Sequence, residues 1–392
     1  MKIFIPVFVK ASVSLSSAID LQRLLIKLGY ECGVCRIDDP RDCLKHLRKE
    51  VADCKPDMIV AINQLRRDFN DIFPKEIPFV TWVQDNCDNI HRIELAEIWR
   101  KNPLDYIFGY VDELLKYAYP PERLCYLTTI VSPEKFRPRE LSASDLEKYA
   151  CDICFASEKS EDIYTYIRYH VMFAYQRFGL KEEDLFELAD ALYAHYQQGG
   201  KLRGFAQFDQ FMKGMPKLAP AYFGANHDGF LILFYWHIAE RIFRHVTLDM
   251  ILATGAKLHL YGGGWEANAK YRKYAKGILP HGPELSKAYQ AAKFSLHVNS
   301  FETFHHRPLE ILMGGGRPLA RCSMTGGTPR IFDPASYAAL QQESVAEIFD
   351  RISKRGDGRG IKGEIIIPSL GDINAYMNCF DNSSQLSAIL DK

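Results

Sequence analysis

The chain has 392 residues, of which 47% are hydrophobic, and this is enough for two domains with separate cores. It carries 49 basic and 49 acidic residues, so no net field draws it toward nucleic acid or an anionic membrane. The apolar start at residues 1–9 is too short for a signal peptide, and the longest later apolar run, residues 230–238, is too short to span a membrane. We expect a cytoplasmic protein without a membrane span.

Four of the ten cysteines form two C-x-x-C pairs, Cys32 with Cys35 and Cys151 with Cys154. Such a pair can hold zinc or serve redox chemistry. Both pairs fall in expected strands, where positions i and i+3 point to opposite faces and cannot share one metal ion. We therefore predict no metal site and interpret the cysteines as small core residues of a reducing compartment.

The first third of the chain alternates short apolar segments with helical patterns. We expect strands at 3–9, 30–37, 57–62, 77–83, 106–111 and 124–127, with helices at 14–28 and 43–51. Mostly apolar strands separated by helices are typical of a parallel sheet covered on both faces. The fold class is therefore α/β, beginning with a doubly wound domain.

A proline-containing linker at 129–138 ends this domain, which we place at residues 1–138. A second domain, 139–392, starts with a strand at 152–156 and continues with strands at 257–261, 294–298 and 318–320. Residues 158–224 are helical, polar and aromatic, and we interpret them as an insertion that could serve as an acceptor platform or a homo-oligomer contact. Helices are expected at 230–250 and 285–292, and the last helices could return to the first domain.

Three glycines, 262–264, follow the strand at 257–261. Bare backbone amides at this position could approach a phosphate, although a tight turn explains the glycines equally well. The sequence has no G-x-G-x-x-G or P-loop pattern, which argues against an ordinary dinucleotide enzyme or a P-loop NTPase.

Two glutamates, Glu302 and Glu310, lie eight positions apart between the strand at 294–298 and the next apolar segment. A carboxylate accepts hydrogen bonds from both hydroxyls of a vicinal diol, which suits a ribose or sugar ring. Arg307 offers a planar fork to a phosphate, and His305 or His306 could donate to phosphate or sugar oxygens. Alternatively, Glu310 is only a helix-dipole partner and the two histidines belong to a solvated loop.

The order of these segments resembles glycosyltransferases of the GT-B fold, in particular the bacterial CgeB-like, glycosyl-transferases-group-1 branch. The resemblance lies in residues 262–265 after a strand, the helix and strand at 284–299, Arg307 three positions before Glu310, and the hinge-like segment 132–138. A further likeness is the segment 82–86 of the first domain. The helical segment 158–224 has no counterpart in this pattern.

The resemblance implies two doubly wound Rossmann-like domains and a UDP- or GDP-sugar donor used as substrate, with no tightly bound cofactor. Glu310 would bind the ribose, and Glu302 would lie near the transferred sugar. The diphosphate would face Arg307 and amides around Thr303 and His306. The base would be held by residues 261–265, which include Gly263, Gly264 and Trp265, and by the loop 278–281. Paired glutamates and the absence of an Asp-x-Asp pattern favour a retaining, metal-independent transfer.

The acceptor hydroxyl should lie at the carboxyl ends of the strands of the first domain. Asp85 follows the expected strand 77–83 and could orient or deprotonate that hydroxyl, which leaves an inverting reaction open. A turn or helix cap is the alternative role for Asp85. The acceptor itself could be a glycan, a protein or a small molecule.

Other functions remain compatible with the sequence. A nucleotide-sugar epimerase of the same fold would need no acceptor pocket, and a non-catalytic carbohydrate- or protein-binding protein would use the aromatic helical segment as an interaction surface. Transfer to a DNA base would require a basic cleft, which the balanced charge does not favour.

Overall fold

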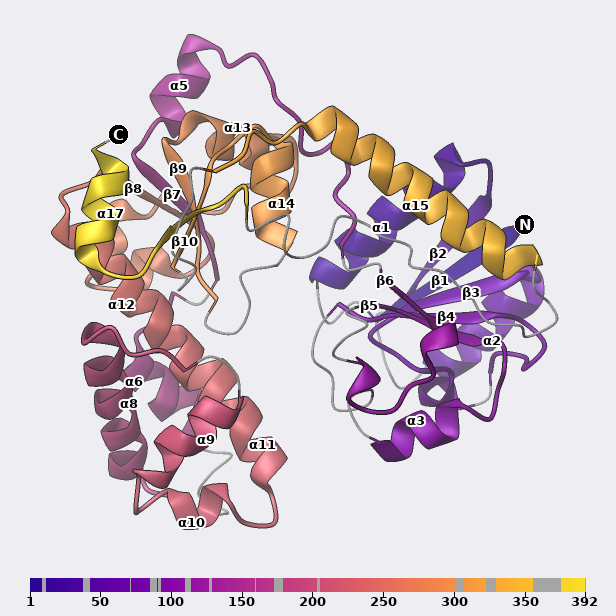
Figure 1. Cartoon of the computed structure of the whole chain (residues 1–392), viewed down its shortest axis with the longest axis horizontal. Coiled ribbons are helices and arrows are strands. Elements are labelled where there is room, and N and C mark those ends of the chain that lie inside the picture. The colour runs from indigo at the N-terminus through magenta and orange to yellow at the C-terminus, as the bar shows by residue number, and fades with distance from the viewer. Residues whose placement is uncertain are drawn as a thin grey trace. The chain divides into compact units, whose positions relative to one another are not determined.

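The computed structural model describes residues 1–8, 12–37, 43–70, 72–84, 90, 93–109, 114–126, 129–158, 160–172, 179–202, 205–299, 306–321, 329–354 and 375–391. The chain divides into two compact units, and each is built on one sheet (Figure 1). The first unit comprises Met1–Pro133 and Ala335–Ser369, and the second comprises Glu134–Pro334 and Leu370–Lys392.

The first unit contains a six-stranded parallel sheet in the order β2-β1-β3-β4-β5-β6. The strands are β1 (Lys2–Phe8), β2 (Glu31–Ile37), β3 (Met58–Ile62), β4 (Phe79–Trp82), β5 (Asp105–Gly109) and β6 (Leu124–Tyr126). Its helices are α1 (Ser12–Lys27), α2 (Cys43–Cys54), α3 (Ile93–Trp99) and α15 (Pro334–Lys354), with short 3-10 turns at Arg66–Phe69 and Pro121–Arg123.

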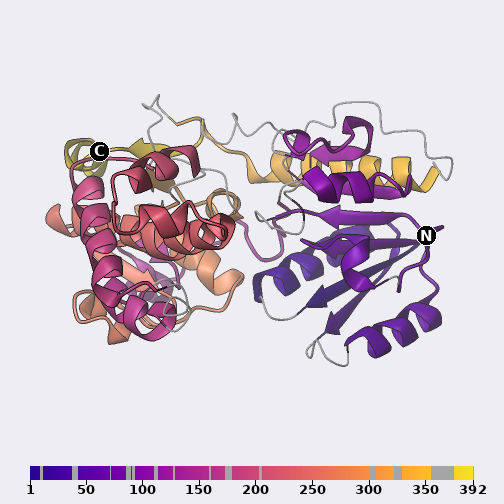
Figure 2. The same ribbon diagram turned by 90° about the horizontal axis from the view of Figure 1, so that it is seen from below.

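Helices cover both faces of this sheet because alternate strand residues point to opposite sides. Ile3 and Ile5 of β1 pack in one cluster with Leu21 of α1 and Phe349 of α15. Phe4, between them in sequence, packs in the opposite cluster with Leu47 of α2. Figure 2 shows α15, drawn in gold, along the strands of the first unit.

A buried ion pair lies in the opposite half of this core. Nε of Arg66 bonds Oδ1 of Asp105 at 2.7 Å, and both side chains are less than a tenth exposed. The guanidinium also donates to the carbonyls of Pro74 (2.5 Å) and Ile77 (2.6 Å), and it lies over the ring of Phe79. A buried charge of this kind is tolerated only when its donors are satisfied, as they are here.

The second unit contains a five-stranded parallel sheet in the order β11-β10-β9-β7-β8. The strands are β7 (Ile153–Ala156), β8 (Leu258–Tyr261), β9 (Phe294–His297), β10 (Pro318–Arg321) and β11 (Asn378–Phe380). The helices α5 (Ala143–Tyr149), α13 (Pro283–Ala291), α14 (His306–Met313) and α17 (Ser383–Leu390) belong to this unit.

The described residues between β7 and β8 are mostly helical, and their helices gather into one group in Figure 1. This group has one continuous core with the second sheet, in which Tyr196 and Phe208 are fully buried. The group contains α6 (Ile163–Tyr166), a π-helical turn (Ile167–Val171), α8 (Glu182–Gln197), α9 (Phe205–Lys213), α10 (Ala219–Tyr222), α11 (His227–Leu231), a second π-helical segment (Ile232–Ala239) and α12 (Glu240–Ala253).

The predicted fold class, α/β with two doubly wound domains, is confirmed by the two parallel sheets and their flanking helices. The chain leaves the first unit at Pro133, within the expected linker, and α15 later returns to the first unit. The expected single helix at 230–250 is instead interrupted by the π-helical segment at Ile232–Ala239. The three-residue strand β11 was not predicted.

The cysteines of the two C-x-x-C pairs carry free thiols in the structure. Burial raises the pKa of the Cys32 thiol to about 12 and that of Cys35 to about 11, so both stay protonated and unreactive. The interpretation of all cysteines as reduced core residues is wrong at Cys379, which is disulfide-bonded. Of the helices in the described ranges, none combines the length and apolar character that a membrane span requires.

Candidate functional site

The second sheet places the carboxyl ends of β9, β7 and β8 next to one another. From β7 the chain runs to β8 on one side, and from β8 it crosses to β9 on the other side of β7. This reversal of strand order makes a switch point, where open parallel sheets bind their ligands. Ser157 follows β7, Gly262 follows β8, and α14 begins at His306 beyond β9.

Glu310 lies one turn into α14, with only 12% of its side chain exposed. Its Oε1 accepts a hydrogen bond from Nε2 of His281, at 2.6 Å. The first turn of α14 contains no acidic residue, so Glu310 is neither an N-terminal cap nor a first-turn dipole partner. A partly buried carboxylate with accepting capacity beyond one imidazole fits a ligand-binding role better than a capping role.

The carboxyl group of Glu310 is held in its charged form. Burial alone raises the pKa of this group, but the hydrogen bond and charge of His281, with the nearby His306 and Arg307, outweigh burial and lower the pKa below its ordinary value. Glu310 is therefore an acceptor, not a proton donor, at neutral pH. Hydroxyl groups of a ligand can donate to such an oxygen.

Arg307 lies next to Glu310 on α14, with its guanidinium 5.9 Å from the ring centre of Phe155 on β7. Tyr289 of α13 shares this neighbourhood. Burial raises the pKa of its hydroxyl and the Glu310 charge adds to the increase, whereas Arg307 opposes it. Arg307 is thus half-buried and lies near Phe155 of β7 and Tyr289 of α13.

A second guanidinium, that of Arg244 on α12, reaches the same place. Its Nη1 donates to Oγ of Ser157 at 2.9 Å, and its Nε lies 3.7 Å from Oε2 of Glu240. Burial lowers the pKa of Arg244 to about 10, and Arg307 adds to this shift while Glu240 opposes it. Arg244 is thus held by Ser157 and Glu240, and the charge of Arg307 acts on it from nearby.

The glycine loop after β8 is shaped by the loop after β7. Gly262 has a φ of +127°, and a Cβ there would lie 2.1 Å from the Ser157 carbonyl oxygen. Gly264 has a φ of +87°, and a Cβ there would lie 2.4 Å from Oγ of Ser160. Ser160 Oγ donates to the Gly263 carbonyl at 2.8 Å. The three glycines therefore form a tight turn that packs against the loop after β7.

Trp265, the residue after the three glycines, is part of the core. Its side chain is fully buried, and its indole Nε1 donates to the Ser157 carbonyl at 2.8 Å. The ring also packs near His245 and Tyr271. The side chain of Trp265 is therefore a core residue that fixes the glycine loop, and the expectation that residues 261–265 hold a base stays a prediction. Gly263 differs from its neighbours, since a Cβ there would meet only Ile278, at 3.8 Å.

Among the other predicted site residues, the structure brings His281, His306, Arg307 and Glu310 together. Asp85, Glu302, Thr303 and His305 lie outside the described residues. Arg244 and Ser157 were missed, since they are distant in sequence and form no recognisable motif. In the described ranges, no three or more His, Cys, Asp or Glu side chains are arranged to hold a metal ion.

No family model matches the chain, and no curated protein matches it. Solved structures share its arrangement at low similarity. A glycosyltransferase from Rickettsia africae ESF-5 is 11% identical with a TM-score of 0.44, covering 100% of this chain and 96% of that one. The spinosyn forosaminyltransferase SpnP is 12% identical with a TM-score of 0.35, covering 100% of both chains. The glycosyltransferase SnogD from Streptomyces nogalater is 10% identical with a TM-score of 0.34, covering 100% of this chain and 99% of that one.

Proposed function

We propose that the chain is a glycosyltransferase of the GT-B type that moves a sugar from a nucleoside-diphosphate-sugar donor to an acceptor hydroxyl. The observation that carries the proposal is the charged, largely buried Glu310, with His281 bound to it and two guanidiniums nearby at the switch point of the second sheet. A carboxylate beside a concentration of positive charge matches a ribose diol followed by a diphosphate.

In this proposal each group near the switch point has one task. Glu310 accepts from the ribose hydroxyls while His281 holds one carboxylate oxygen. Arg307 and Arg244 face the diphosphate and neutralise the charge that develops on it as it leaves. Gly263 and the apolar side chain of Ile278, which is 76% exposed, offer a surface for the base.

The finer assignments depend on the resemblance seen in the sequence. Glu302 would bind the transferred sugar, with Thr303 and His305 near the phosphates, and Asp85 would orient the acceptor hydroxyl. The two guanidiniums would serve in place of a divalent cation, so we propose a metal-independent transfer with retention of configuration and a UDP- or GDP-sugar as donor.

The test is nucleotide binding by Glu310→Ala. Loss of charge-assisted hydrogen bonds costs roughly 2–3 kcal/mol, so we expect UDP or GDP affinity to fall about 30- to 150-fold. Isothermal titration calorimetry with UDP, GDP, ADP and CDP measures this effect. Glu147→Ala, an exposed change on α5, is the matched control and should bind as the parent does. Equal affinity in both variants would remove Glu310 from the site.

A second measurement separates transfer from epimerisation. A donor sugar labelled in its ring should reach an acceptor, or water, with release of the nucleoside diphosphate. Inversion at C2 of the sugar with the nucleotide still attached would contradict the transferase proposal. The absence of both nucleotide binding and turnover would instead favour a non-catalytic protein.

A further inference from the structure

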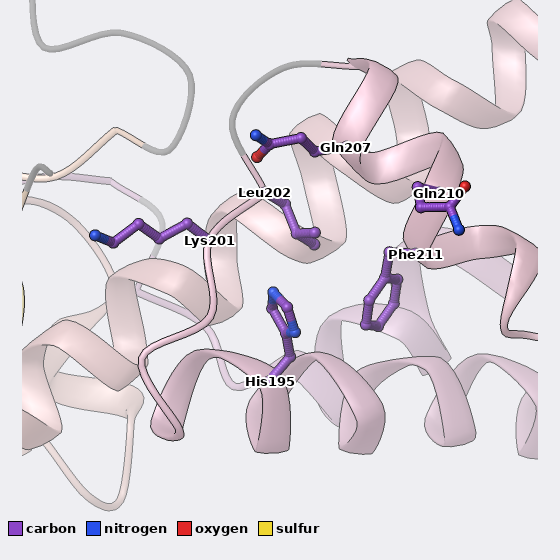
Figure 3. Close-up of a pocket in the computed structure, with 6 residues that line it drawn as sticks. All are labelled: His195, Lys201, Leu202, Gln207, Gln210 and Phe211. Atoms are coloured by element: carbon purple, nitrogen blue, oxygen red, sulfur yellow. The ribbon is translucent and has the colours of Figure 1, made fainter.

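A separate pocket of about 550 Å³ lies among the helices between β7 and β8. This volume is within the range of roughly 300–1,000 Å³ that small-molecule sites occupy. Its walls come from the end of α8, the segment after α8, and α9, none of which belongs to the candidate donor site (Figure 3). The lining residues are His195, Lys201, Leu202, Gln207, Gln210 and Phe211.

Two rings form the apolar part of this pocket. Phe211 points from α9 toward α8, where the His195 ring stands (Figure 3), and the ring centres are 5.4 Å apart. The His195 ring lies close against Gly200. A Cβ at this position would be only 2.5 Å from Nε2 of His195, so the ring needs a glycine here. Phe211 is half-buried, so part of its side chain is accessible from the pocket that it lines.

Among the described lining residues, the polar part of the pocket carries little net charge. The side chains of Gln207 and Gln210 are exposed, and the amide of Gln210 has two donors and one accepting oxygen. The ammonium group of Lys201 is paired with the carboxylate of Asp381. An anionic ligand would have to displace this carboxylate, so the lining favours a neutral, hydroxyl-rich molecule over a phosphate or carboxylate.

We infer that this pocket binds a neutral sugar residue, as a subsite for a glycan acceptor. A sugar ring combines an apolar C–H face, which packs on an aromatic side chain, with a rim of hydroxyls, which exchange hydrogen bonds with amides. The identification of the bound glycan as the acceptor rests on the proposed function, whereas the binding of a sugar here does not.

Saturation-transfer-difference NMR on the full chain, without nucleotide, tests the inference. The probes are a set of neutral monosaccharides and disaccharides, with glucuronic acid and glucosamine as charged comparisons. We expect saturation of the C–H protons of at least one neutral sugar. Phe211→Leu, which keeps apolar bulk but removes the flat ring, should weaken its binding about fivefold, and the double change Gln207→Ala with Gln210→Ala about tenfold.

Two controls make the result decisive. Gln197→Ala changes an exposed amide of α8 outside the pocket and should leave sugar binding unchanged. Glu310→Ala should also leave it unchanged, so a failure of the donor site and a failure of this pocket are distinguishable. No saturation with any neutral sugar, preferential binding of a charged sugar, or binding that both pocket variants retain in full would overturn the inference.

Discussion

The two units share one architecture but use their buried arginines in opposite ways. In the first unit, Arg66 is matched by Asp105 and by two carbonyl oxygens inside the core. In the second unit, burial lowers the pKa of Arg244, the Glu240 carboxylate opposes this shift, and the Arg307 guanidinium adds to it. Loss of either partner of the first pair strands a buried charge, whereas the second pair has a further guanidinium beside it, which the proposed function assigns to an anion.

The largest effect that this comparison predicts is on the stability of the first unit. Arg66→Met leaves the Asp105 carboxylate buried without its partner, which should lower the free energy of unfolding by roughly 3–5 kcal/mol. Urea denaturation followed by tryptophan fluorescence measures the loss. The double variant Arg66→Met with Asp105→Leu should recover part of it, because no charge is then stranded. A single variant as stable as the parent would show that the pair contributes nothing.

Arg307→Gln should show the reverse pattern, with binding affected and stability preserved. Removing this guanidinium relieves repulsion on Arg244, so the free energy of unfolding should change by less than about 0.5 kcal/mol. Affinity for the preferred nucleoside diphosphate should fall roughly ten- to a hundredfold, as expected when a charged hydrogen bond is lost. Titration calorimetry measures the affinity and scanning calorimetry the stability. Arg272→Gln, a change at an exposed residue, is the control for both. Destabilisation as large as that of Arg66→Met would make Arg307 a structural residue.

A smaller, pH-dependent effect should come from His259 on β8, which is 4% exposed. Burial lowers its pKa from 6.5 to about 4, with Lys276 and Lys257 adding to the shift. Between these values the unfolded chain binds a proton that the folded chain does not, so stability is lost as the pH falls through this window. The loss should be about 2 kcal/mol between pH 7 and pH 5.

His259→Gln removes this titration, and its unfolding free energy should therefore depend less on pH than that of the parent. Urea denaturation at pH 5, 6, 7 and 8 makes the comparison. The unfolding free energies of parent and variant should change in parallel between pH 7 and pH 8, where the imidazole is neutral in the folded and the unfolded chain. Parallel curves down to pH 5 would mean that His259 keeps an ordinary pKa.

The sequence predicted most strands because a buried parallel strand is a short apolar run between turn residues, as in β3, where every residue is buried. It missed β11, a three-residue strand of which only Phe380 is fully buried. The π-helical segment Ile232–Ala239 was also missed, because a local change in hydrogen bonding leaves the apolar pattern of a helix intact.

The same limits apply to the site. Glu310 and Arg307 were predictable because they belong to one local motif. Arg244 was not, because its bond to Ser157 joins positions 87 residues apart, and only folding brings them together. The place of the Trp265 side chain could not be predicted, because an aromatic residue after a glycine turn can stack on a ligand or fill the core, and in the structure it fills the core.

The return of α15 to the first unit has a consequence for how the protein is made. Val345, Ile348, Phe349 and Ile352 complete one apolar face of a sheet whose last strand ends at Tyr126. Because α15 follows most of the second unit in the chain, that face lacks α15 during synthesis until most of the second unit has left the ribosome. Exposed apolar surface of this kind is prone to aggregation. A truncated product that stops before α15 should therefore need a chaperone that the finished chain does not.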